Sequence, residues 1–160
     1  GVRVFVADNF DELEKFVAYR AEAGLLLRVS FRAPGAVCDL SRKFGCDPED
    51  ALALARLAKE VGVGVRGLSF HVGSQSADAI KHVEAIEVCA RLLAAAHRER
   101  LGPCDTLDIG GGFPIDYGER APPIQRPFNS SICPMARTIS GEMLDNRSSK
   151  RVMDVICAIV

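Results

Sequence analysis

The stretch GLSFHVGSQS, residues 67–76, joins an apolar run to a polar turn. The apolar run is typical of a buried strand, and it ends in His71, with Gly73 and Ser74 close behind. A histidine in this place is compatible with a structural role, with acid or base chemistry, with metal binding, or with stacking on a flat ligand. A metal is disfavoured, because no second histidine or carboxylate follows at ligand spacing. The structural, acid–base and stacking roles stay open, and the residues on the neighbouring strands help to choose among them.

Three further strands and three helices are predicted around this stretch. The strand patterns cover residues 2–7, 25–30 and 106–109, and the helical patterns lie within residues 8–23, 46–62 and 77–101. Because a helix separates each strand from the next, the strands run parallel with right-handed crossovers. Two architectures fit such units: an open doubly wound sheet, or part of an eight-stranded β/α barrel. Four strands cannot close a barrel, so the barrel requires further strands outside this chain.

Two polar loops are expected to meet at one edge of this sheet. HVGS follows the third strand, and GGGF follows the fourth. Neighbouring strands lie about 5 Å apart, so His71, Ser74 and the glycines Gly110, Gly111 and Gly112 could contact one ligand. Consecutive glycines let backbone amides approach an anion such as phosphate, although a tight turn also explains them. The pattern is neither GxGxxG nor a P-loop, so those two nucleotide sites are excluded.

Four other polar residues near these elements carry predictions. Arg28 interrupts the apolar LLLRV, where its guanidinium needs either an acidic partner or a bound anion. Asp108 lies two residues before the first of these glycines and is expected to orient their loop. His82 and His97 fall on the helix within residues 77–101, and both are expected at the surface.

Composition narrows the class of partner. Lys and Arg number 20 against 21 Asp and Glu, without a basic run, which argues against nucleic-acid binding. No apolar stretch approaches the roughly 20 residues that cross a bilayer, and the first residues lack a signal-peptide pattern. We therefore expect a cytoplasmic protein that binds a small molecule. The six cysteines show no C-x-x-C spacing, which predicts reduced and mostly buried thiols.

Four separated motifs together resemble one enzyme family. LLLRV (25–29), LSRKFG (40–45), GLSFHVGSQ (67–75) and LDIGGGFP (107–114) are similar, in order and spacing, to the pyridoxal-phosphate-dependent decarboxylases of ornithine, lysine, arginine and diaminopimelate. The resemblance covers residues 1 to about 124 and implies an alanine-racemase-like barrel. The expected fold class is therefore α/β: a partial parallel TIM-type barrel of about four β/α units, with an atypical C-terminal tail.

The resemblance also implies a role for each candidate residue. It places His71 against the pyridine ring of pyridoxal 5'-phosphate, Ser74 with Gly110, Gly111 and Gly112 at the phosphate, and Arg28 near the cofactor. SFHVGSQ with GGGFP lies closer to the ornithine and lysine branch than to the diaminopimelate branch. The implied reaction is decarboxylation of a basic amino acid, with L-ornithine giving putrescine for polyamine biosynthesis. The family's active sites form between subunits, so a homodimer is expected.

Some of the family's catalytic residues have no counterpart here. The lysine that forms the Schiff base is expected upstream of Gly1, so no catalytic residue is assigned within this chain. The EPGR motif that should follow the glycines is replaced by NRSSKRVMDV. We therefore expect residues 1–124 to be a partial pyridoxal-phosphate-binding barrel and residues 125–160 a divergent, poorly ordered tail. A fragment that is inactive alone is one hypothesis; a non-catalytic binding or regulatory relative is the alternative.

Overall fold

The computed structural model describes residues 1–32, 36, 38–76 and 78–113 of the chain. The predicted tail, residues 125–160, lies outside the described residues. The elements follow one another in the order β1 (Val4–Ala7), α1 (Phe10–Lys15), η1 (Val17–Tyr19), β2 (Gly24–Val29), α2 (Pro48–Glu60), β3 (Gly64–Phe70), α3 (Ala79–Arg98) and β4 (Thr106–Asp108). The alternation of strand and helix is the one that the sequence predicts.

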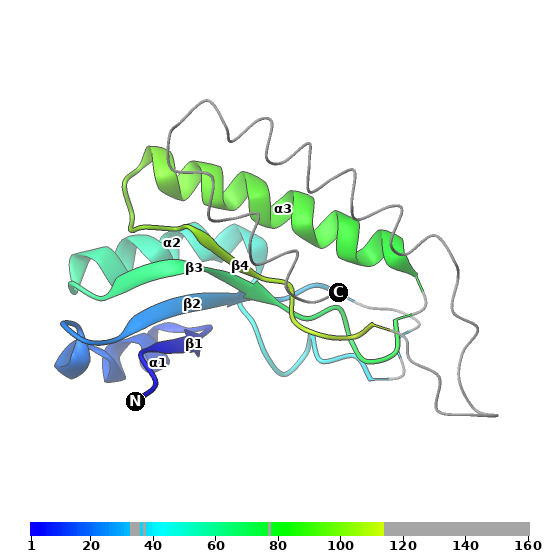
Figure 1. The fold of residues 1–160 in the computed structure, drawn as a ribbon, viewed down its shortest axis with the longest axis horizontal. Helices are drawn as coiled ribbons and strands as arrows, with labels where there is room; N and C mark the ends of the chain where they lie inside the picture. Colours follow the sequence, from blue (N-terminus) through cyan, green and yellow to red (C-terminus); the bar gives the residue numbers. More distant parts are fainter. Residues whose placement is uncertain (33–35, 37, 77, 114–160) are drawn as a thin grey trace.

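The four strands form one parallel sheet in the order β1-β2-β3-β4. Each strand therefore pairs with the strand that follows it in the chain, and the order does not reverse at a switch point as in a doubly wound sheet. Helices α2 and α3 lie side by side along one face of the sheet (Figure 1). In the described residues, this is the arrangement of one arc of a β/α barrel.

Local sequence signals set the ends of the helices. Helix α2 begins at Pro48 after Asp47, as the N-cap pattern predicts, although the Asp47 side chain makes no capping hydrogen bond. At α3, Asp78 Oδ1 accepts a hydrogen bond of 3.0 Å from the Ile80 backbone N–H. The first predicted helix is shorter than its pattern suggests, since α1 ends at Lys15 and a 3₁₀ turn follows.

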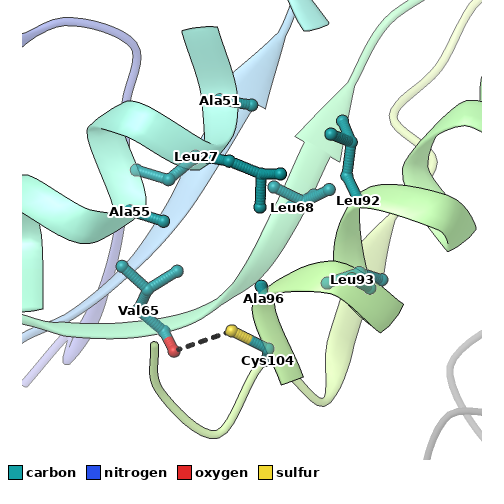
Figure 2. A pocket seen from close by; sticks show the side chains of 11 residues that line it. Leu27, Ala51, Ala55, Val65, Leu68, Leu92, Leu93, Ala96 and Cys104 are labelled. Carbon is teal, nitrogen blue, oxygen red and sulfur yellow. Dashed lines mark hydrogen bonds between the residues drawn. The ribbon is translucent and has the colours of Figure 1, made fainter. Parts of the chain in front are cut away.

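The apolar core lies between the sheet and helices α2 and α3. Figure 2 shows its centre, where side chains of β2 and β3 meet those of both helices around a cavity of about 10 Å³. Leu27, Leu68 and Leu93 line this cavity, and at this size and polarity it holds at most one water and offers no ligand site. Cys104 Sγ lies 3.9 Å from the Val65 carbonyl at its edge.

The cysteines follow the prediction only in part. Cys89 and Cys104 are buried and Cys46 is half-buried, but Cys38 is exposed. Burial raises the pKa of the Cys89 thiol to about 12 and those of Cys46 and Cys104 to about 11. These three groups are therefore thiols rather than thiolates at neutral pH.

Candidate functional site

A row of polar residues crosses the sheet on the face opposite α2 and α3. Arg28 on β2 is in register with Ser69 on β3, and Ser69 is in register with Asp108 on β4. Because side chains alternate along a strand, these three lie on the other face from Leu27 and Leu68, which face the helices. Ser69 Oγ donates a hydrogen bond of 3.0 Å to Asp108 Oδ2. The polar row therefore identifies the face of the sheet that can bind a polar ligand.

Asp108 connects this row to the glycine loop, defined as Gly110–Gly112. Its Oδ1 atom accepts a hydrogen bond of 2.9 Å from the Gly110 backbone N–H. One carboxylate thus fixes both the Ser69 side chain and the first glycine. The prediction that Asp108 orients the loop is confirmed.

His71 follows β3 at the same edge. Its Nδ1 atom accepts a hydrogen bond of 3.0 Å from the Gly73 N–H, so the ring proton resides on Nε2 in the neutral form. Burial lowers the pKa of His71, the positive charge of Arg28 lowers it further, and Asp108 acts in the opposite sense. The site therefore holds a neutral, flat imidazole at neutral pH.

The glycine loop packs directly against the turn that contains His71. Gly110 and Gly112 have φ values of 62° and 97°, which side chains rarely allow. A methyl group on Gly110 would lie 2.1 Å from the Phe70 carbonyl oxygen, and one on Gly112 would lie 2.2 Å from the Gly73 carbonyl oxygen. A methyl group on Gly111 would lie 3.3 Å from His71 Nε2. Close approach of the two loops thus requires glycine.

Ser74 lies on the loop after β3, and that loop is tied at two points. The Ser74 N–H donates a hydrogen bond of 3.2 Å to the Cys38 carbonyl, and the Ser76 N–H donates one of 2.8 Å to the Gly112 carbonyl. The loops after β3 and β4 therefore run side by side, as Figure 1 shows to the right of the sheet. The structure brings His71, Ser74 and the three glycines to one edge, as the sequence predicts.

Arg28 makes no ion pair with a carboxylate among the described residues, so the acidic partner considered from the sequence is not found there. Its guanidinium carbon lies 5.0 Å from the ring centre of Phe44, a cation–π contact. Phe44 belongs to the loop after β2 and is itself exposed. Since an aromatic face leaves the hydrogen-bond donors of the guanidinium unused, Arg28 remains able to attract an anion near His71.

His82 contradicts the prediction that it lies at the surface. It is 0% exposed, its Nε2 atom lies 3.4 Å from the Gly111 carbonyl oxygen, and its ring stacks on Phe113 with centroids 4.5 Å apart. The missed signal is its spacing to Ile86, Cys89 and Leu93, which form the buried stripe of α3. His97 is exposed, as predicted.

These groups fit a flat heteroaromatic ring that carries a phosphate. The neutral His71 imidazole offers a planar surface, and the glycine loop has no side-chain atoms between its amides and an anion. The described residues contain no group of three or more His, Cys, Asp or Glu side chains that could hold a metal ion.

Comparisons with known proteins identify the family of this chain. A sequence model described as "Pyridoxal-dependent decarboxylase, pyridoxal binding domain" matches residues 1–153. A lysine/ornithine decarboxylase of Selenomonas ruminantium is 40% identical over 71% of this chain, which spans 29% of that relative.

Solved structures of decarboxylases are also similar to this chain. The chain resembles lysine/ornithine decarboxylase from Vibrio vulnificus in complex with putrescine, with a TM-score of 0.68 and 43% identity over 83% of this chain and 35% of that one. It also resembles the arginine decarboxylase of Paramecium bursaria Chlorella virus bound to agmatine, with a TM-score of 0.71 and 30% identity over 82% and 36%. These findings confirm the predicted barrel class and pyridoxal cofactor. The chain belongs to the pyridoxal-dependent decarboxylase family and forms part of its pyridoxal-binding domain.

Proposed function

We propose that this protein decarboxylates a basic amino acid, most specifically L-ornithine to putrescine, and that this chain supplies the ring and phosphate sites of its pyridoxal phosphate. One observation carries the proposal: a neutral imidazole at the end of β3 lies against a glycine loop at the end of β4. When bound, the cofactor supplies an electron sink for the charge left on the substrate carbon as carbon dioxide departs.

The residues of the site divide the work of holding this cofactor. The His71 imidazole packs against the flat ring and limits its tilt. The Ser74 hydroxyl and the amides of Gly111 and Gly112 bind the phosphate, while Arg28 adds positive charge nearby. Asp108 holds the loop through the Gly110 N–H, which keeps the phosphate site formed before the ligand arrives.

The choice of substrate is supported by the relatives rather than by a specificity pocket. The Selenomonas and Vibrio relatives are both named lysine/ornithine decarboxylases, and the Vibrio structure contains putrescine. The viral relative that acts as an arginine decarboxylase is less identical to this chain, at 30% against 43%. The names of the Selenomonas and Vibrio relatives, rather than this identity, favour ornithine or lysine over arginine.

The described lysines do not provide the group that would link the cofactor covalently. Lys15, Lys59 and Lys81 lie on helices, where they interact with Glu12, the Glu99 carbonyl and Glu84, and Lys43 is exposed on a loop. None of these four lies in the polar row or next to the glycine loop. We propose that the lysine comes from outside the described residues; a non-catalytic binding protein is the second candidate that this observation favours.

The proposal also covers the oligomeric state and the cellular location of the protein. We propose a cytoplasmic homodimer, which is supported by the resemblance to a family whose active sites form between subunits. No helix among the described residues combines the length and apolar character that a membrane span needs.

The test combines cofactor binding with turnover. The purified full-length protein, of which this chain supplies the ring and phosphate sites, is titrated with pyridoxal phosphate and followed by absorbance. It is then assayed for carbon dioxide release from L-ornithine, L-lysine and L-arginine. We expect saturable binding and fastest release from ornithine. Binding without release from any of the three would favour the non-catalytic candidate, and absence of binding would overturn the proposed site.

A further inference from the structure

His82 contacts the glycine loop from α3, whereas His71 lies beside the same loop in the turn after β3. It belongs to the buried stripe of α3, close to the first turn of the helix, and it is one of three buried polar residues, with Ser69 and Ser76, among the described residues. An alanine or leucine would suit that stripe at lower cost, because burying a polar ring requires compensating interactions. The contacts of its ring therefore call for a specific explanation.

The ring of His82 makes two contacts at the end of the glycine loop. The Gly111 carbonyl can only accept, so His82 Nε2, at 3.4 Å, must be the donor. The ring also stacks on Phe113, the residue after the loop, with an interplanar angle of 25°. One side chain thus fixes both the middle carbonyl of the loop and the residue that leaves it.

Gly111 is consequently enclosed from two directions. A methyl group on its α-carbon would approach His71 Nε2 to 3.3 Å, while its carbonyl points to His82. The adjoining Gly112 carbonyl accepts from the Ser76 N–H at 2.8 Å. When carbonyls of consecutive peptides are bound on the protein side, the peptide N–H groups are left directed elsewhere, where an anion can reach them.

We propose that His82 is a positioning residue for phosphate binding: it locks the glycine loop from the side of α3 so that the loop amides are pre-arranged for the phosphate of the cofactor. This inference rests on the proposed function, and it assigns His82 no contact with the cofactor or substrate. Pre-arrangement lowers the entropy lost on binding, so its removal should weaken binding through the phosphate specifically.

Two substitutions separate the hydrogen bond from the packing. His82→Phe keeps an aromatic ring on Phe113 but removes the donor, whereas His82→Gln keeps an N–H donor near the position of Nε2. His97→Phe on the exposed side of the same helix is the matched control. Affinities for pyridoxal phosphate and for pyridoxal, which lacks the phosphate, are measured for all four proteins, together with amide hydrogen exchange at Gly110 and Ser76 without ligand.

We expect His82→Phe to weaken pyridoxal phosphate binding about five- to tenfold, leave pyridoxal binding unchanged, and speed exchange at both amides. His82→Gln should restore the affinity, and His97→Phe should match the unaltered protein. Equal losses for both ligands would indicate a merely structural role and overturn the inference. If the unaltered protein binds pyridoxal phosphate and His82→Phe binds it equally well, this inference alone fails. If the unaltered protein does not bind it, the proposed function fails and this inference falls with it.

Discussion

The two faces of the sheet are built from alternate residues of the same strands, but they serve different ends. Toward α2 and α3 the strands present Leu27, Leu68 and Phe70, which are buried in the apolar core. Toward the other face they present Arg28, Ser69 and Asp108, in register across three strands. Stability and ligand binding can therefore be altered almost independently, by substitutions one residue apart along a strand.

The largest expected effect is on the helix-facing side. Phe70 is 1% exposed, and its ring packs edge-on against Phe31 with centroids 5.6 Å apart. Phe70→Ala should lower the free energy of unfolding by about 3–5 kcal/mol, since it removes apolar contacts and leaves a cavity. Its neighbour on the other face, Ser69→Ala, loses one hydrogen bond and should cost only about 0.5–1.5 kcal/mol. Denaturant unfolding measures both losses; equal values would contradict the separate roles of the two faces.

The second effect concerns the point where the two loops touch. Gly112→Ala places a methyl group 2.2 Å from the Gly73 carbonyl oxygen at a φ of 97°. Overpacking together with left-handed strain should lower the free energy of unfolding by about 2–4 kcal/mol and weaken pyridoxal phosphate binding. Gly64→Ala is the control, because nothing lies within 4 Å of its added methyl group. Unaltered cofactor affinity in Gly112→Ala would count against the glycine loop as the phosphate site.

A third prediction separates the charge of Asp108 from its hydrogen bonds. Asp108→Ala removes the acceptor for Gly110 N–H and Ser69 Oγ and should cost about 1.5–3 kcal/mol in the free energy of unfolding. Asp108→Asn keeps an acceptor for Gly110 and should cost less. Both variants should lower the pKa of His71 further, because the Asp108 charge raises it in the unaltered protein. NMR titration of His71 measures this; an unchanged pKa would separate Asp108 from the ring.

The sequence predicts the fold more completely than the site because the two depend on different kinds of information. Strand and helix periodicity is local, so the β/α alternation and the Pro48 helix start could be read directly. Parallel strand ends meet at one edge, so His71 and the glycine loop could be placed together. The Phe44 ring under Arg28 could not be foreseen, since it depends on the path of a loop. The prediction that His82 lies at the surface is wrong because it rests on the usual exposure of histidine. Its spacing to Ile86 and Cys89 indicates the buried stripe instead.

The smallest expected effect is a dependence of stability on pH that arises from the buried His82. Burial is the main cause that lowers the pKa of His82 below its ordinary 6.5; the Gly111 carbonyl opposes this, and the nearby His71 adds to it. In the unfolded chain His82 takes up a proton near pH 6.5, whereas in the folded protein it does so only at lower pH. The unfolded state therefore binds more protons below pH 6.5, and stability present above that pH falls as the solution is acidified, by at most about 1.4 kcal/mol per pH unit for one group.

His82→Gln removes this titrating group and should reduce the fall in melting temperature between pH 6.5 and 5. Part of the fall should remain in the variant, because the pKa of His71 is also lowered in the folded protein. Identical slopes in the His82→Gln variant and the unaltered protein would show that His82 titrates as it does in water. Such a result would contradict the burial of His82 against the glycine loop. It would also remove the distinction between His82, which supports the loop from α3, and His71, which faces the ligand.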